Sequence, residues 1–296
     1  MIIKPYILSQ INMGDFSIAG YSVAGEESVI MSPELDVCFD IGKCPREALS
    51  INNVFLTHGH ADHSAGLLYY FSQRDFQAIA GGRIFLPHRM LDAVEALISA
   101  WGKVEGHLPP YELVGMGDGE EFEIRRDLFV KAFATRHVPG SLGFSIVEER
   151  RKLKEEFLGL DSPQIVELKK KGVEISNTIE LPLVAYMGDT AKADYSGNPY
   201  IRDARVLLME CTFFDDEHVD RAKAGRHIHV DELAEVLAGM NNEKIILTHV
   251  TRRTNLGYAR RMLKKSLPAE ILAKTTFLMS REHIPEKLEP ENESEN

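Results

Sequence analysis

The stretch Val54–His63, VFLTHGHADH, decides the fold of this chain. An apolar run of strand-forming residues leads directly into the pattern His-x-His-x-Asp-His, which begins at His58. On a continuing strand, successive side chains would point to opposite faces, so these imidazoles and this carboxylate would not converge. On a tight loop at the end of a strand they can surround metal ions, and the donor set suits zinc. The stretch therefore predicts a metal site at the edge of a sheet.

Three further apolar runs each deliver one ligand-type side chain where a predicted strand ends. The runs and the residues that follow them are Leu128–Ala134 with His137, Leu183–Met187 with Asp189, and Lys244–Thr248 with His249. Each run alone is a weak signal. Because loops at strand ends gather along one edge of a sheet, the three side chains and the His-x-His-x-Asp-His loop together predict a site with room for two metal ions.

The rest of the chain alternates β-rich runs with helical stretches, without a regular βαβ rhythm, which predicts a layered sheet protein with helices outside. The other predicted strands are Ser28–Met31, Asp36–Asp40, Val54–Thr57, Arg83–Leu86, Gly143–Val147, Val206–Glu210, Ile245–Thr248 and Thr275–Met279. The predicted helices are Leu91–Trp101, Asp231–Met240 and Tyr258–Lys265, with Asp231 as an N-cap.

The charge balance argues against a protein that is basic all over. The chain has 34 Lys and Arg against 45 Asp and Glu, a net charge of −11, whereas nucleic-acid-binding proteins usually show a basic footprint. Positive charge is concentrated in the segment 148–174, whose basic residues are Arg150, Arg151, Lys152, Lys154, Lys169, Lys170 and Lys171. The composition of this segment is compatible with a helical arm that binds a partner and equally with a solvated helical hairpin.

Length and composition indicate a globular protein. The 296 residues are 44% hydrophobic and 27% charged, which is ordinary for a folded domain. We predict one domain over residues 1–285, with 148–174 inserted, and an acidic disordered tail over 286–296. No run approaches the ~18 apolar residues of a membrane span, and no secretory signal is recognised. The scattered cysteines Cys38, Cys44 and Cys211 favour the reducing cytoplasm.

With these motifs in place, the chain resembles the metallo-β-lactamase-fold hydrolases and, within them, tRNase Z, the tRNA 3′-processing endonucleases, in their short plant-type form. The resemblance covers roughly residues 18–255, and the matching stretches include LTHGHADHSAGL, HVPGSLGFSIVEERRKLKEEFLGL, MGDT, MECTFFDD, GRHIHVDEL and LTHVTRR. It implies an α/β protein, an αββα sandwich with a short protruding helical arm.

The resemblance also implies the ligand set and the catalytic groups. Two zinc ions are expected per chain, with Mn²⁺ or another divalent metal as a possible substitute. The first metal would be held by His58, His60 and His137, the second by Asp62, His63 and His249, with Asp189 bridging. The expected catalytic residues are Asp62, Glu210 and His227, the last two helping to protonate the departing 3′ oxygen. The expected substrate-binding residues are Arg253 and the arm residues Lys152, Lys154, Lys169, Lys170 and Lys171.

The function implied is a zinc-dependent endoribonuclease that removes the 3′ trailer of precursor tRNA, working as a homodimer in the cytoplasm and away from membranes. The alternative is a small-molecule metallo-hydrolase of the same fold that acts on a phosphodiester, lactone or thioester, which the overall acidity favours. A non-catalytic RNA-binding subunit ranks last, because every expected ligand is present. Met209 and Thr254 depart from residues common in the family, which bears on substrate preference more than on metal chemistry.

Overall fold

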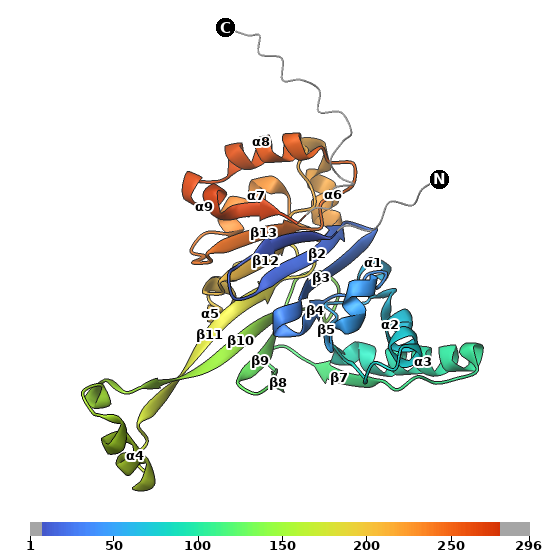
Figure 1. Ribbon diagram of the computed structural model, residues 1–296. Helices are drawn as coiled ribbons and strands as arrows, with labels where there is room; N and C mark the ends of the chain where they lie inside the picture. The colour runs from blue at the N-terminus through green and yellow to red at the C-terminus, as the bar shows by residue number, and fades with distance from the viewer. Residues whose placement is uncertain (1–7, 279–296) are drawn as a thin grey trace.

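The computed structural model describes residues 8–278, which form two seven-stranded sheets packed face to face between helices (Figure 1). The first sheet has the order β1 (Ser9–Asn12), β2 (Ser17–Val23), β3 (Glu27–Ser32), β4 (Val37–Phe39), β5 (Asn53–Phe55), β6 (Arg83–Pro87) and β7 (Glu112–Met116). The second has the order β14 (Thr275–Phe277), β13 (Lys244–Thr248), β12 (Val206–Glu210), β11 (Ser176–Tyr186), β10 (Leu142–Leu153), β9 (Leu128–Ala134) and β8 (Glu121–Arg125).

The helices lie on the outer faces of the two sheets, apart from the fourth, which lies in the arm that projects beyond β10 and β11 (Figure 1). They are α1 (Ala61–Ser64), α2 (Leu67–Phe76), α3 (Leu91–Glu105), α4 (Ser162–Lys170), α5 (Pro199–Arg202), α6 (Val219–Gly225), α7 (Val230–Val236), α8 (Leu256–Ser266) and α9 (Ala269–Lys274). Short 3₁₀ turns are η1 (Pro33–Leu35), η2 (Arg46–Ser50), η3 (His88–Met90), η4 (Glu155–Phe157) and η5 (Asp216–His218). None of the helices within residues 8–278 is long and apolar enough to cross a membrane.

The apolar residues divide into three layers, which is the packing that an αββα sandwich requires. The middle layer lies between the two sheets, where Phe39 meets Tyr186 and Phe55 meets Phe144. One outer layer packs α2 and α3 against the first sheet, and the other packs α7 and α8 against the second. The predicted α/β sandwich is therefore confirmed.

Parallel pairing brings the ligand-bearing strand ends to one edge. β5 pairs in parallel with β4 and β6, and β12 pairs in parallel with β11 and β13. The carboxyl ends of these strands therefore point the same way within each sheet. A hydrogen bond from Leu142 N to Thr57 O, 3.0 Å long, joins the two sheets at this edge. The loops after β5, β11, β12 and β13 all open there.

The sequence-predicted strands correspond to observed ones, with the bounds of β9 and β12 identical. The predicted helices correspond to α3, α7 and α8, but one helix is missing from the prediction and one cap is wrong. Helix α2 was not predicted. The N-cap of α7 is His229, whose Nδ1 accepts a hydrogen bond from Asp231 N, so Asp231 is not the cap. The last residue of the predicted strand Thr275–Met279 and the predicted tail at 286–296 lie outside the described residues.

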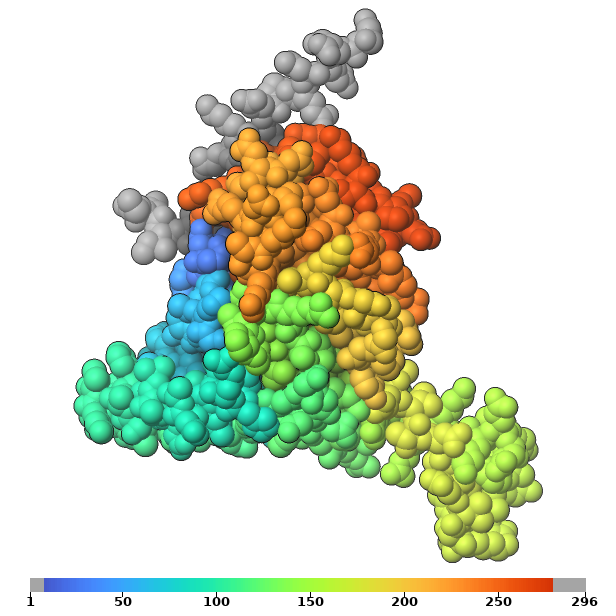
Figure 2. Space-filling view, turned by 180° about the vertical axis from the view of Figure 1, so that it is seen from behind, coloured from blue at the N-terminus to red at the C-terminus, as the bar shows by residue number. Residues whose placement is uncertain are grey.

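The arm differs in form from the helical arm that was predicted. Its first part is a two-stranded ribbon, because β10 and β11 stay paired from Glu148 to Leu153 beyond the rest of the sheet. Only the tip is helical, in η4 and α4, where Asp161 and Gln164 form a capping box. Figure 2 shows the arm standing clear of the body. The ribbon gives the arm a stiff base, and the helical tip with its lysine run at 169–171 lies at the far end.

Candidate metal centre

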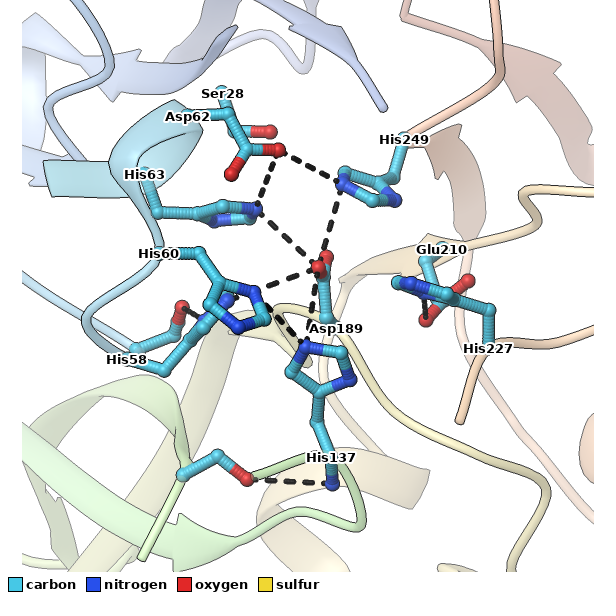
Figure 3. A network of polar contacts seen from close by, with 12 residues as sticks. Ser28, His58, His60, Asp62, His63, His137, Asp189, Glu210, His227 and His249 are labelled. Atoms are coloured by element: carbon cyan, nitrogen blue, oxygen red, sulfur yellow. Dashed lines mark hydrogen bonds and ion pairs between the residues drawn. The ribbon is translucent and has the colours of Figure 1, made fainter. Parts of the chain in front are cut away.

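The His-x-His-x-Asp-His loop turns sharply as soon as β5 ends. His60 is in an extended conformation at the N-terminus of α1, and His63 N donates to His60 O. Asp62 and His63 therefore project from one helical turn, while His58 and His60 precede it. The side chains of this single loop face a common centre (Figure 3), as the spacing predicted.

The remaining predicted ligands come from the second sheet and meet this loop around Asp189. Asp189 Oδ2 lies 3.3 Å from Nε2 of both His63 and His249, and 3.8 Å from Nε2 of both His58 and His137. The side chains of Asp62 and His60 complete the group. Asp62 Oδ2 lies 3.5 Å from His249 Nε2, and His60 Nδ1 lies 3.2 Å from His137 Nε2. The ligand atoms fall into the sets His58, His60, His137, Asp189 and Asp62, His63, His249.

The buried atoms at this centre fit divalent cations. The Nε2 atoms of His58, His63 and His249 and the Oδ1 atom of Asp189 are buried and have no hydrogen-bond partner among the described residues. A buried polar atom without a partner costs about 1–3 kcal/mol. Four such atoms around one centre, of the nitrogen and oxygen types that zinc and similar metals bind, are accounted for by cations that take their lone pairs.

The outward-facing ring nitrogens of the histidines are held by other side chains. His63 Nδ1 donates to Asp40 Oδ2 at 2.7 Å, and His58 Nδ1 lies 3.0 Å from Thr57 Oγ1. His249 Nδ1 lies 3.0 Å from Thr212 Oγ1. Contacts of this kind fix the ring orientation of a metal ligand and raise its basicity. The Nε2 atoms are thereby directed toward the centre before any cation binds.

Asp40 is the centre's main supporting carboxylate, and the sequence analysis missed it. Its side chain is fully buried and also accepts hydrogen bonds from Thr57 N, Thr57 Oγ1 and Tyr186 OH. Tyr186 belongs to the second sheet, so one carboxylate ties His63 to both halves of the sandwich. A threonine beside each ligand motif (Thr57, Thr190, Thr212) was the available signal for such supporting contacts.

The electrostatics favour uptake of cations at His58 and Asp189, whereas His63 must first give up a proton. Burial and the neighbouring His63 lower the pKa of His58 to about 2, so its imidazole is neutral and has a free lone pair. Burial would lower the pKa of His63, but the carboxylates of Asp189 and Asp40 raise it well above its ordinary value. Burial would raise the pKa of Asp189, yet His249 and His63 hold it well below its usual range. The centre thus carries carboxylate charge that a metal ion can neutralise.

Glu210 and His227 form a buried pair beside the ligands. Glu210, at the end of β12, is fully buried and accepts hydrogen bonds from Thr190 N, Ile228 N, Thr212 Oγ1 and His227 Nδ1, the last at 2.9 Å. Burial lowers the pKa of His227, but Glu210 raises it more strongly, to about 9. His227 therefore carries a proton at neutral pH, and its ring stacks on that of the ligand-type residue His249 at 5.1 Å.

Two backbone features set the positions of ligands. His249 has a φ of 58°, which is uncommon outside glycine and is typical of functional sites. Its N–H donates to Ser22 Oγ of β2 at 2.9 Å, so an early strand holds the last ligand. Gly188, just before Asp189, has a φ of 59°, and a side chain there would collide with Thr57. Only glycine allows the second sheet to approach the histidine loop this closely.

The predicted substrate-binding residues are not all near the centre. Arg253 is exposed on the loop that follows His249 and lines a cavity there. The arm lysines lie at the opposite end of the sheet, because β11 starts at the arm and ends close to Asp189. Its 11 residues span roughly 30–35 Å at about 3.3 Å per residue. The structure therefore separates the cluster of ligands from the basic segment.

Comparison with known proteins gives consistent matches. The model of the β-lactamase superfamily domain matches residues 40–250. The chain is 38% identical to tRNase Z TRZ1 of Arabidopsis thaliana over 242 residues, covering 80% of this chain and 86% of that protein. It is 35% identical to the chloroplastic tRNase Z TRZ2 of the same plant, covering 92% and 78%. The structure of human tRNase Z, short form, shares the fold with a TM-score of 0.57, at 19% identity, covering 88% and 94%.

Proposed function

The chain belongs to the β-lactamase superfamily and, within it, to the tRNase Z family, and we propose on this basis that it removes the 3′ trailer of precursor tRNA as a metal-dependent endoribonuclease. The geometric observation that carries the proposal is the buried Glu210–His227 pair next to the cluster of unpartnered ligand atoms. A hydrolase of activated esters has little need of a proton donor, whereas a sugar 3′ oxygen leaves readily only when it is protonated.

We propose that the centre holds two zinc ions, or Mn²⁺ or another divalent metal. His58, His60 and His137 would hold one ion, and Asp62, His63 and His249 the other, with Asp189 shared. When bound, such ions supply Lewis-acid polarisation of the phosphodiester and a more acidic water molecule. Elemental analysis of protein purified with zinc in the medium should give about two zinc ions per chain, and Asp189→Ala should lower that content.

The chain's own residues supply the remaining roles. Glu210 accepts the Nδ1 proton of His227, which leaves the Nε2 proton of that ring available for the departing 3′ oxygen. The four hydrogen bonds that Glu210 accepts hold it in one position. Arg253 contacts a substrate phosphate on the side of His249. These roles follow from the family resemblance and from the contacts described above.

We propose that the arm at 148–174 grips the tRNA away from the cut, as an insertion in one domain over residues 1–285. The side chains of Lys169, Lys170 and Lys171 are exposed at its tip, and Lys152 and Lys154 lie where the ribbon passes into that tip. Backbone contacts made by lysines are independent of sequence and suit a substrate class with many members. Residues 148–174 are neutral overall, with seven Lys and Arg against seven Asp and Glu, so what the arm offers a tRNA is the local run of three lysines at its tip.

We also propose that the protein is a homodimer and acts in the cytoplasm. An apolar stripe on α3 supports self-association, since Leu97 is 50%, Trp101 40% and Val104 72% exposed. These residues are spaced i, i+4, i+7 and so lie on one helix face. Sedimentation should give a dimer, and Trp101→Glu should shift it toward the monomer. The cytoplasmic location stays a prediction from the sequence.

The decisive experiment offers the zinc-loaded protein a precursor tRNA and bis(p-nitrophenyl) phosphate in parallel and maps the RNA ends. The proposed function predicts one cut after the discriminator nucleotide, leaving a 3′-hydroxyl on the tRNA. The second candidate, a small-molecule hydrolase, is favoured by the net charge of −11, which repels RNA at long range. Turnover of the small ester without any cleavage of tRNA would favour that candidate.

A further inference from the structure

We propose that a cavity beside His249 and His227 receives the nucleobase on the 5′ side of the cleaved bond, with the Phe213 ring and the Arg221 guanidinium as its recognition surface. The inference rests on the proposed function, because it assigns one nucleotide of the RNA to a place next to the metal centre.

The cavity adjoins the metal centre, although no ligand-type residue of the centre is part of its lining. It has a volume of about 280 Å³ and is lined by residues of the β2–β3 turn, of the loops after β12 and β13, and of the segment that includes α6. In the β2–β3 turn, Gly25 N donates to Asp62 Oδ2 at 2.9 Å, and Ala24 N donates to Val250 O at 3.2 Å. The same turn thus holds one ligand-type carboxylate and the residue that follows His249, so a group in this cavity lies directly beside the centre.

The lining combines the largely buried residue Phe213, which is 9% exposed, with charged groups of both signs, including the carboxylates of Glu26 and Asp215. The Arg221 guanidinium lies 5.8 Å from the centre of the Phe213 ring, and the His218 ring lies 5.6 Å from it. Arg221 and Arg253 have no carboxylate partner among the described residues. Flat π surfaces and guanidinium planes bind unstacked bases by stacking, with little dependence on sequence. The cavity therefore suits a nucleobase, with Arg253 left for an adjoining phosphate.

The position of His227 fixes which nucleotide enters. The centre of the Phe213 ring lies 6.2 Å from that of His227, the proposed proton donor to the departing 3′ oxygen. The ribose that owns this oxygen must lie at His227, and its base then faces the adjoining cavity. A second cavity of about 440 Å³, lined by Arg136 and Lys192, flanks the centre on the side of His137 and has no aromatic residue in its lining.

The experiment compares three precursor tRNAs: the complete RNA, one with an abasic ribose immediately 5′ of the cut, and one abasic immediately 3′ of the cut. Wild type, Phe213→Leu and Arg221→Gln are assayed for kcat/KM on each RNA. On complete RNA we expect Phe213→Leu to lower kcat/KM about tenfold, within the range of base–aromatic stacking, and Arg221→Gln to lower it several-fold. On the 5′-abasic RNA both penalties should shrink to within about twofold, and on the 3′-abasic RNA they should persist.

The control is Lys223→Ala, which removes a charge from the same short helix at an exposed position outside the cavity lining, and which should behave like wild type on all three RNAs. Arg221 is exposed, so its variant keeps the test valid if Phe213→Leu folds poorly. Penalties that persist on the 5′-abasic RNA, or vanish on the 3′-abasic RNA, would overturn the inference alone. If wild-type protein cleaves no precursor tRNA, the proposed function itself fails.

Discussion

At the metal centre the polar side chains are buried and held by several partners, whereas on the arm the charged side chains are exposed and sparsely paired. Glu210 has no exposed surface and accepts four hydrogen bonds. Lys171 is 64% exposed and pairs with Glu167, which is exposed to the same extent. Exposed pairs of this kind contribute about 0–1 kcal/mol. The contacts at the metal centre hold its side chains in defined positions. The side chains of the arm offer charge but are not held in defined positions.

The contrast separates the two parts of an enzyme's task. Buried groups that hold one another cannot be altered singly without loss, so changes at the centre should act on every substrate. Exposed lysines act nearly independently, so changes on the arm should be graded and confined to substrates long enough to reach it.

Asp62→Ala should reduce hydrolysis of both precursor tRNA and a small phosphodiester to the background rate. The carboxylate belongs to a candidate metal set at a strand end rather than to the apolar core, so the thermal unfolding midpoint of the apoprotein should change little. Metal content and both activities are measured on the same preparation. Retention of either activity would show that this cluster is not where hydrolysis takes place.

His227→Ala should slow tRNA cleavage on the order of 10²–10⁴-fold, the range for loss of a general acid. Hydrolysis of bis(p-nitrophenyl) phosphate should fall less, because its phenolate leaving group needs little protonation. Single-turnover rates on both substrates give the comparison. Equal losses would instead assign His227 a structural or metal-tuning role.

Asp40→Asn should weaken metal affinity by about 10–100-fold, the usual effect of altering a partner of a metal ligand. The amide keeps the size of the carboxylate but cannot hold His63 Nδ1–H with the same charge. Competition with a chromophoric chelator measures the affinity directly. An unchanged affinity would mean that the histidine ring is oriented by packing alone.

The triple replacement of Lys169, Lys170 and Lys171 by Ala should raise KM for precursor tRNA by roughly tenfold or less and flatten its salt dependence. Each lost phosphate contact removes about 0.7–0.9 from the slope of log affinity against log salt. Replacing Arg260, Lys264 and Lys265 of α8 by Ala, three exposed positions on the body, removes the same number of charges and is the matched control. If tRNA cleavage does not respond to the triple change, the arm is a solvated projection without a role in binding.

The ligand cluster could be predicted from the sequence because its residues follow apolar strands at short, regular distances. Helix α2 could not be predicted from the sequence, and the reason is the buried residue Arg74. The buried positions of this helix are Leu67, Tyr70, Phe71 and Arg74, a helical spacing in which a cation takes an apolar place. The Arg74 guanidinium is buried and donates to the carbonyl oxygens of Leu49 and Ile51. Since those partners lie far along the chain, no local pattern reveals that this arginine faces the interior.

The ribbon of the arm escaped prediction for a different reason. The residues of β10 from Glu148 to Lys152 are all charged. Charged residues such as Glu and Lys have a low intrinsic preference for strands. Cross-strand pairing with β11 overrides this local preference. Beyond the edge of the sheet, β10 and β11 remain strands because their backbones hydrogen-bond to each other. Supporting residues such as Asp40 escaped as well, since their importance lies in contacts between the two sheets.

The hydrogen bond from His249 N to Ser22 Oγ has a consequence for the life of the protein. Among the proposed ligands, those of the loop His58–His63 are synthesised early. The last ligand, His249, follows only when most of the chain has been synthesised. That last ligand is then fixed by one of the first strands. A nascent or truncated chain therefore lacks a complete centre until the first strands and the last ligand have met.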